Sequence, residues 1–453
     1  MLNNKTIQKA YPLSGTQEGM LFNNIYKPKS DIYFVQAAYK LEGVIDVVLF
    51  KRSWEEIVKE YDVLRTGFLW EALDKPLQYV LKEKELPFLE HDWQDVASSD
   101  LKEKLNFFVE EDRKQFFDLT KASVFRIHFI KCAKKRYYLI WSCHHIILDG
   151  WSSSIILQKV LQKYKGFSQG NNAGKVEENI IQYKEYIVWL KNQDSFKMRS
   201  FWKKYLNNIK ASILNFGDKV YLEDTLYAEH RFVLFPNSRV AEFVRSNFIT
   251  PNTLIQGALG KVLQHYTQQK ENVFGITVSG RAINLPGIQE MVGLFINTLP
   301  LKIENLEKIK TISYLKALQE RTQQINEYGN SISLAEIQSM AKRSKEGLFN
   351  VILVFENYPI QKEEPKGFDI ETLKTLEKSE YPLSLIVTLD SDIAIEFKYQ
   401  KSFFSKDFIE RMGLHIRNSI EGMIAFPNKY VKEISVLTKE EKSQILEGWN
   451  ATA

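Results

Sequence analysis

The chain has 453 residues, more than one hydrophobic core usually accommodates, so its length predicts two domains of about 200 residues each. Its 61 basic and 56 acidic residues are interspersed and leave a net charge of +5, which excludes the basic patch of a nucleic-acid-binding protein. Two cysteines are too few for a disulfide framework, and no apolar stretch reaches the roughly 20 residues that a membrane span needs. Since the N-terminus also has no signal-peptide core, the sequence predicts a cytoplasmic protein.

The N-terminal part alternates between helix-type and strand-type patterns. Ser14 is placed to cap a helix that runs through the apolar residues 20–22. Residues 32–41 alternate as in a strand, and residues 47–61 have an apolar face at helical spacing. Arg65 follows this second helix, and we interpret it as a member of a structural ion pair rather than as a substrate ligand.

Two strands are predicted ahead of the most informative motif in the chain. Residues 124–132 and 136–142 are apolar and are separated by a tight turn. The second strand leads into residues 143–150, whose sequence is CHHIILDG. Beyond this Asp-Gly turn, the serines at residues 152–154 offer side-chain oxygens to cap a helix that we expect to end near Tyr164.

This segment holds the groups that acyl transfer requires. His144 and His145 stand where the strand ends, and imidazole exchanges a proton near neutral pH. The start of the following helix, at Gly150, offers backbone N–H groups to a developing oxyanion. Asp149 supplies a carboxylate that we expect to hold the loop in place.

A metal site and a cysteine nucleophile are the alternative interpretations of this segment. His and Asp are zinc-ligand types, but adjacent residues of a strand point to opposite faces, so His144 and His145 do not readily share one ion. No other His or Cys residues in the sequence have metal-ligand spacing, and we expect no metal. Nothing in the sequence indicates a reactive thiol at Cys143, which we interpret as a small buried residue.

The clearest linker in the chain follows. Residues 166–175 contain three glycines and two asparagines, which places a domain boundary at residue 170. Beyond it, Thr250 and Pro251 begin a helix, and residues 273–278 predict a buried strand. Two further strands and a helix are expected at residues 381–388, 393–399 and 405–423.

The sequence His144-His145-Ile146-Ile147-Leu148-Asp149-Gly150 resembles the HHxxxDG signature of nonribosomal peptide synthetase condensation domains, which belong to the chloramphenicol-acetyltransferase-like superfamily. The likeness extends over about residues 10–450. Other segments are similar to further motifs of that family, although Glu60-Tyr61 stands where the family usually has Arg-His. These segments are residues 11–22, 61–68, 182–190, 291–300 and 347–359, with a weak match at residues 330–336.

The resemblance implies an α/β fold of two chloramphenicol-acetyltransferase-like subdomains that form a V-shaped pseudodimer. The N-terminal subdomain would cover residues 1–170, and the C-terminal subdomain residues 171–437, with segments bridging to the first. Residues 438–453 would begin a linker toward an adenylation domain, because Gly448-Trp449-Asn450 resembles that junction. A capping box is expected where this linker begins, at Thr438.

The same resemblance implies peptide-bond formation, in which the amine of an acceptor aminoacyl thioester attacks a donor thioester. His145 would act as a base or would position the amine, while His144 and Asp149 would hold the loop. Backbone N–H groups near Gly150 would stabilise the oxyanion. The remaining substrate-binding residues would be Trp151, Ser152 and Asn297, with Asn297 orienting a thioester or pantetheine carbonyl.

An ion pair is expected to hold the loop from the other side. Asp149 would pair across the interface between the two subdomains with Arg281, and Arg65 is the alternative partner. The buried carboxylate would then have a structural rather than a chemical role.

The partners and alternatives follow from the family. No cofactor would be bound by the domain itself, since the substrates arrive on phosphopantetheine arms of donor and acceptor carrier proteins. An adenylation domain would follow downstream, and the domain would be a monomer. An epimerisation domain, a stand-alone acyltransferase and a non-catalytic recruitment domain are the alternatives. The intact His144-His145 motif argues against recruitment and heterocyclisation domains, and no Glu-Gly-His-Gly motif supports epimerisation.

Overall fold

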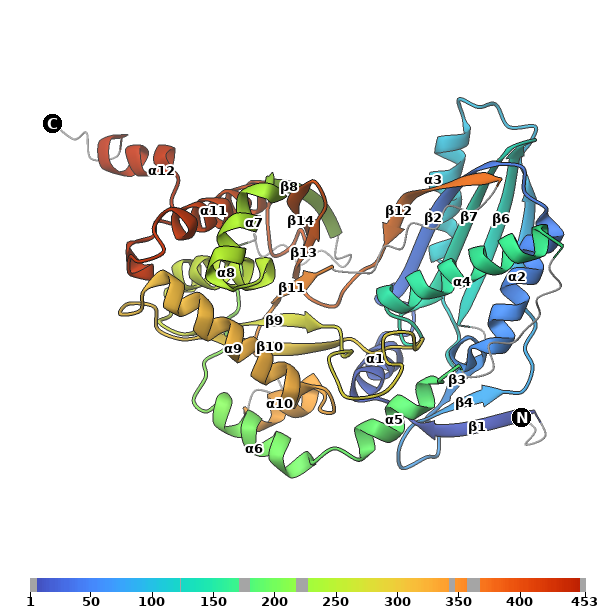
Figure 1. The fold of residues 1–453 in the computed structure, drawn as a ribbon, viewed down its shortest axis with the longest axis horizontal. Helices are drawn as coiled ribbons and strands as arrows, with labels where there is room; N and C mark the ends of the chain where they lie inside the picture. Colours follow the sequence, from blue (N-terminus) through green and yellow to red (C-terminus); the bar gives the residue numbers. More distant parts are fainter. Residues whose placement is uncertain are drawn as a thin grey trace. The chain divides into compact units, whose positions relative to one another are not determined.

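The computed structural model describes residues 6–122, 124–170, 180–216, 227–341, 347–356 and 367–448. The chain divides into two compact units, and both contain helices and a β-sheet (Figure 1). Unit 1 comprises Met1–Gln193, Arg281–Ile296 and Tyr358–Ser379, and unit 2 comprises Asp194–Gly280, Asn297–Asn357 and Glu380–Ala453. Each unit is therefore assembled from separate stretches of sequence. The boundary predicted at residue 170 adjoins residues 171–179, which lie outside the described ranges.

A five-stranded sheet in the order β12-β2-β7-β6-β5 forms the centre of unit 1. Its strands are β2 (Phe34–Gly43), β5 (Phe88–Asp92), β6 (Phe125–Ala133), β7 (Arg136–His144) and β12 (Phe368–Leu376). The strands predicted at residues 32–41, 124–132 and 136–142 are confirmed, with ends shifted by about two residues. The sequence reasoning missed β12, which arrives from the second half of the chain and pairs antiparallel with β2.

Helices cover both faces of this sheet (Figure 1). On one face, α2 (Val47–Glu60) and α4 (Gly150–Ser168) bury Trp54 and Ile156 against Leu139 of β7. On the other face, α3 (Leu101–Arg113) buries Leu105 and Val109 against Ile140, also of β7. Because successive strand residues point to opposite faces, β7 is enclosed on both sides by apolar side chains. The strand that carries the histidine motif is thus firmly packed within unit 1.

The remaining elements of unit 1 include α1 (Gly15–Tyr26), α5 (Tyr183–Lys191) and a second sheet in the order β1-β4-β3. The strands of that sheet are β1 (Ile7–Pro12), β3 (Thr66–Leu69) and β4 (Leu77–Leu81). The predicted cap of α1 is confirmed. Ser14 Oγ accepts a hydrogen bond of 3.2 Å from Gln17 N, and Gln17 Oε1 accepts one of 3.0 Å from Ser14 N.

Unit 2 is built on a six-stranded sheet in the order β10-β9-β11-β13-β14-β8. The strands are β8 (Tyr227–Pro236), β9 (Asn272–Val278), β10 (Asn297–Ile303), β11 (Val351–Phe355), β13 (Leu383–Leu389) and β14 (Asp392–Gln400). The helices are α6 (Ser195–Tyr205), α7 (Asn237–Asn247), α8 (Pro251–Thr267), α9 (Thr311–Gly329), α10 (Leu334–Met340), α11 (Lys406–Ala425) and α12 (Lys439–Ser443). The predicted strands and helices of this half are confirmed, including the Thr250 cap with Pro251 at the first helical turn.

The C-terminal capping box is also confirmed, since Thr438 Oγ1 accepts a hydrogen bond from Glu441 N and Glu441 Oε2 accepts one from Thr438 N. Trp449 and Asn450, which carried the resemblance to an adenylation junction, lie outside the described residues. Within the described ranges, no helix combines the length and the apolar character that crossing a bilayer requires.

Candidate active site

The histidine motif begins where β7 ends. His144 is the last residue of that strand, and His145 is the first residue beyond it. The backbone holds both in place, because His144 N donates to Val124 O at 2.9 Å and His145 N donates to Tyr33 O at 2.8 Å. Both side chains are buried, with 3% and 5% of the residue surface exposed. Two imidazoles therefore stand at the end of a well-packed strand, in surroundings with little water.

His144 shapes the turn that follows it. Its Nδ1 accepts a hydrogen bond of 3.1 Å from Ile146 N, so that a neutral ring carries its proton on Nε2. Burial and the neighbouring His145 lower the pKa of His144 to about 3, which keeps the ring neutral at physiological pH. Its Nε2 is buried without a hydrogen-bond partner among the described residues. These contacts agree with the loop-holding role expected for His144.

His145 has a charged partner that the sequence did not indicate. Its Nε2 lies 3.1 Å from Oε1 of Glu377, the first residue after β12. Burial by itself lowers the pKa of His145, but the charge and hydrogen bond of Glu377 outweigh it and raise the pKa to about 9. The other ring nitrogen, Nδ1, is buried with no hydrogen-bond partner in the described part of the chain. A pKa of about 9 favours the imidazolium form of His145 at neutral pH, paired with the carboxylate of Glu377.

Asp149 is the N-cap of α4 and a clamp on a distant segment. Its Oδ1 accepts a hydrogen bond of 2.8 Å from Ser152 N, and its Oδ2 accepts one of 2.9 Å from Phe295 N. Its own N–H donates to Gly293 O at 3.2 Å. The expectation that the serines at residues 152–154 cap this helix is wrong, because they lie within it. Aspartate is a preferred N-cap residue, and Asp149 precedes Gly150, the first helical residue.

Ser152 is fully buried, and its hydroxyl is hydrogen-bonded to Gly293 and Arg281. Its Oγ donates to Gly293 O at 2.7 Å and accepts from Gly293 N at 3.1 Å. It also accepts a hydrogen bond of 2.8 Å from Arg281 Nη2. These contacts hold the segment Arg281–Ile296 against α4, and the substrate contact expected of Ser152 stays a prediction.

Arg281 lies at the centre of that segment's contacts. Its Nη2 is 3.6 Å from Asp149 Oδ1, and its Nη1 donates to Ile288 O at 2.5 Å and to Met291 O at 3.0 Å. Although it comes from the second half of the sequence, Arg281 belongs to unit 1, so this ion pair lies within one unit. Trp151 covers the guanidinium, with the ring centre 5.3 Å away, and donates its Nε1–H to Gln289 O.

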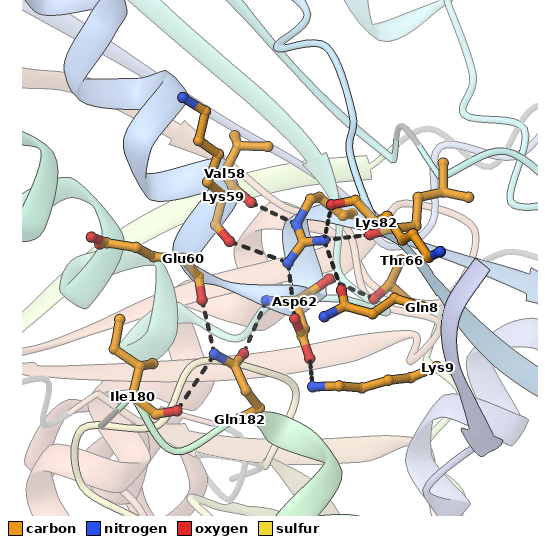
Figure 2. A network of polar contacts seen from close by, with 12 residues as sticks. Gln8, Lys9, Val58, Lys59, Glu60, Asp62, Thr66, Lys82, Ile180 and Gln182 are labelled. Carbon is orange, nitrogen blue, oxygen red and sulfur yellow. Dashed lines mark hydrogen bonds and ion pairs between the residues drawn. The ribbon is translucent and has the colours of Figure 1, made fainter. Parts of the chain in front are cut away.

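Arg65, the alternative partner for Asp149, is engaged elsewhere. Its Nη2 contacts Asp62 Oδ1 at 2.9 Å, and Asp62 Oδ2 is 2.8 Å from Lys9 Nζ (Figure 2). Figure 2 also shows Gln182, which links Glu60 and Asp62 to the start of α5. Arg65 ties α2 to strands β1 and β4, as a structural residue does. Its remaining N–H groups bind backbone carbonyls of Val58, Lys59, Leu81 and Lys82 and the side chain of Gln8.

Asn297 opens β10 in unit 2, and its amide is used by the protein. Its Nδ2 donates to Gly329 O at 2.8 Å and to Ile332 O at 3.0 Å, and its Oδ1 accepts from Thr298 N. The residue is 7% exposed. These contacts join β10 to the connection between α9 and α10, so the structure gives Asn297 a local structural task.

The cysteine and metal alternatives gain no support. Burial raises the pKa of the Cys143 thiol to about 12, with a smaller contribution from Glu377. Cys143 is buried, as expected. Within the part of the chain that the structure describes, no three His, Cys, Asp or Glu side chains are grouped so that they could hold a metal ion.

Known proteins resemble this chain over its whole length. A family model for the condensation domain matches residues 7–446. Surfactin synthase subunit 2 of Bacillus subtilis strain 168 is 31% identical over 465 residues, covering 100% of this chain and 13% of that protein. Gramicidin S synthase 2 of Brevibacillus brevis is 31% identical over 453 residues, covering 97% of this chain and 10% of that protein. The chain thus spans a small fraction of the length of these relatives.

Solved structures share the fold. The X-domain from teicoplanin biosynthesis has a TM-score of 0.79 at 18% identity, covering 96% of this chain and 99% of that one. A four-domain nonribosomal peptide synthetase bound to AMP and glycine has a TM-score of 0.78 at 17% identity, covering 96% of this chain and 34% of that one. These likenesses confirm the expected fold class, an α/β chain of two chloramphenicol-acetyltransferase-like units.

Proposed function

Because the chain belongs to the condensation domain family of nonribosomal peptide synthetases, we propose that it joins two substrates delivered on the phosphopantetheine arms of donor and acceptor carrier proteins. Domains of this family form peptide bonds, an acyltransferase-type reaction. The relatives are synthetases of which this chain matches only a part, so carriers and an adenylation domain are the expected neighbours.

The observation that carries the proposal is the intact HHxxxDG motif in a built loop. His145 is buried at the end of β7, and His144 shapes the turn after it. Asp149 fixes the start of α4 and the segment containing Phe295. An intact motif whose histidines are buried and held in place supports catalysis over the recruitment alternative.

The reaction needs one proton to be moved. The α-amine of the acceptor, with a reference pKa near 8, attacks the donor thioester carbonyl as the neutral amine. A C–N bond forms and the C–S bond breaks; the attacking nitrogen loses a proton and the leaving sulfur gains one. His145 is the group that we assign to this transfer, in its neutral form. The oxyanion of the tetrahedral intermediate would be stabilised by backbone N–H groups near Gly150, at the start of α4.

The contacts of the other residues support structural roles for most of them. Asp149, Arg281 and Ser152 form the clamp that keeps the loop in shape, and Arg65 stabilises a separate part of unit 1. Trp151, half-buried over Arg281, is the residue of the expected substrate set that we retain as a candidate contact.

The test is a condensation assay with donor and acceptor carrier proteins, each loaded with an amino acid, and mass spectrometry of the acceptor-bound product. Wild-type protein should form the dipeptide, and His145→Ala should lose at least about a hundredfold in rate, the usual range for general acid–base catalysis. His230→Ala, which removes an imidazole from β8 in unit 2, is the matched control and should retain wild-type activity. Thermal melting of each variant checks its folding.

Each result excludes a specific alternative. A folded His145→Ala protein with wild-type turnover would disprove the role of His145. Conversion of the donor residue to its D form without a new bond would identify an epimerisation domain. If no loaded carrier pair reacts, the recruitment interpretation replaces the proposed function.

A further inference from the structure

Two strands that are far apart in sequence end side by side in unit 1. β12 and β7 both pair antiparallel with β2, on its two sides, so they run in the same direction. Gln36 of β2 is in register with Leu376 of β12 and with Ser142 of β7. The residues that follow these two partners must emerge at the same end of the sheet. This topology brings Glu377, the residue after β12, to His145.

The backbone ties the two residues into one structure. Tyr33, which precedes β2, accepts a hydrogen bond of 2.8 Å from His145 N and donates one of 3.3 Å to Lys378 O. Tyr33 has a φ of 67°, a left-handed conformation that is uncommon for a residue other than glycine. Such strain persists only where the surroundings enforce it, and it often marks a functional site. Tyr33 therefore holds the segment after β12 against the histidine motif.

The two side chains in contact, His145 and Glu377, differ in their exposure to solvent. His145 Nε2 lies 3.1 Å from Glu377 Oε1, and the His145 side chain is 6% exposed whereas that of Glu377 is 43% exposed. The buried imidazole is thus bonded through Nε2 to a side chain that is itself partly exposed to solvent. A substrate group that binds Nε2 has to replace this carboxylate.

The charge on His145 depends mainly on this carboxylate. Burial lowers its pKa, and Glu377 raises it to about 9, with a smaller contribution from Asp149. His144 stays neutral because its own pKa is lowered to about 3. The other charged or titratable groups in this region belong to β7, the segment before β2, α3 and the segment after β12. They are Cys143, Tyr33, Asp31, Arg113 and Lys378, of which Asp31 pairs with both Arg113 and Lys378.

We propose that Glu377 is a positioning residue for the condensation reaction, whose carboxylate fixes the His145 ring through Nε2 and holds a proton on it until substrate enters. The proposal rests on the proposed function, because it assigns a role to Glu377 through His145. The ion pair is the resting state of the site. For His145 to accept the proton of an attacking amine, the imidazolium must first give up its own proton to solvent, which is easier once the carboxylate has left Nε2, because burial then lowers the pKa of the ring.

A comparison of Glu377→Gln with Glu371→Gln separates this role from a general effect of removing a negative charge near β12. Glu377→Gln keeps the size of the side chain and a hydrogen-bonding group but removes the charge. Glu371→Gln makes the same change at an exposed position on β12 and is the matched control. Glu377→Asp keeps the charge on a shorter side chain and should restore part of the wild-type behaviour. Because Glu377 is partly exposed, we expect all three proteins to fold, which thermal melting checks.

The first readout is the titration of His145 by NMR, with its signal identified by its loss in His145→Ala. In wild type and Glu371→Gln, His145 should remain protonated up to about pH 9. In Glu377→Gln the charge that offsets burial is gone and burial is the largest remaining influence on the ring, so the titration of His145 should move to clearly lower pH. This measurement needs no catalytic activity. It therefore decides whether Glu377 holds the proton on His145 even if the proposed function fails.

The second readout is the pH profile of kcat/KM for condensation on loaded carriers. The acceptor amine titrates near pH 8 in every variant, so the difference between variants reports His145. The acidic limb of Glu377→Gln should lie at least about one pH unit below that of wild type and Glu371→Gln. An unchanged His145 titration in Glu377→Gln overturns the proposal, and so does an unchanged acidic limb when the titration has moved.

Discussion

Asp149 and Arg281 are joined mainly through Ser152. The nearest atoms of the two charged groups, Arg281 Nη2 and Asp149 Oδ1, are 3.6 Å apart, whereas Arg281 Nη2 is 2.8 Å from Ser152 Oγ. Ser152 N in turn donates to Asp149 Oδ1 at 2.8 Å. The ion pair is therefore part of a buried network that fastens the segment Arg281–Ile296 to the start of α4. Each of the three side chains makes polar contacts with more than one neighbouring group.

Asp149→Ala should destabilise the fold more than it alters the chemistry. The change removes the cap of α4 and the acceptor of Phe295 N, and it takes the paired carboxylate away from the buried Arg281. Loss of one partner of a buried pair costs about 3–5 kcal/mol, a large part of the roughly 5–15 kcal/mol of a typical domain. Asp149→Asn keeps an oxygen for the cap and should lose less. Urea unfolding measures both, and an inactive Asp149→Ala protein with wild-type stability would contradict the structural role.

Gly293→Ala should destabilise the same clamp by a steric route. A Cβ at Gly293 would lie 2.1 Å from Cδ2 of Tyr183, a fully buried ring whose hydroxyl donates to Leu294 O at 2.6 Å. Overpacking of this kind costs about 1–3 kcal/mol. Gly19→Ala in α1, where a Cβ meets nothing within 4 Å, is the control and should leave the melting temperature equal or higher. Equal melting of the two variants would show that Tyr183 moves aside.

The stability of the protein should depend on pH through His144. Its pKa is about 3 when folded and 6.5 when unfolded, so between these values the unfolded chain binds the extra proton. The contribution of a neutral His144 is therefore present above pH 6.5 and is lost as the pH falls toward 3. His144→Asn keeps an acceptor for Ile146 N but does not titrate. As the pH falls from about 7.5 to about 4.5, the melting temperature of wild type should fall more than that of His144→Asn; parallel curves would refute this.

His145 should show the opposite dependence. Its folded pKa lies above its unfolded value, so its pairing with Glu377 stabilises the fold below pH 6.5 and ceases to do so as the pH rises through about 9. The difference in melting temperature between wild type and Glu377→Gln should accordingly be greatest in acid and should vanish above about pH 9. A difference that grows with pH would mean that the contact is not an ion pair.

Substrates on carrier proteins should react faster than free ones. Tethering raises the effective concentration of each reactant, and docking of the carrier adds contacts that a small thioester lacks. Donor and acceptor are each supplied as a carrier-bound or a small-molecule thioester, in all four combinations at equal concentration. We expect the doubly carrier-bound pair to react fastest, by about tenfold or more over the free pair. Equal rates would favour a stand-alone acyltransferase.

Local sequence determined the elements of this protein and the identity of its motif. Ser14, Thr250, Ser405 and Thr438 mark helix starts because a cap depends only on residues within one turn. Strands β6 and β7 are joined by a tight turn, so their pairing is also local. The place of the motif was also local: the histidines lie at the end of a strand, and Asp149-Gly150 begins a helix, as the patterns on either side of the motif predicted.

Tertiary structure alone decided which groups surround these residues. The pattern of β12 fits a strand but does not specify a partner, and only its pairing with β2 brings Glu377 to His145. Likewise, Arg281 lies in the second half of the sequence but folds into unit 1 with Asp149. The pKa values of two adjacent histidines then move in opposite directions, because the carboxylate of Glu377 outweighs burial at His145, whereas burial prevails at His144. Side-chain chemistry is local, but pKa values and partners depend on contacts between segments that the linear sequence keeps apart.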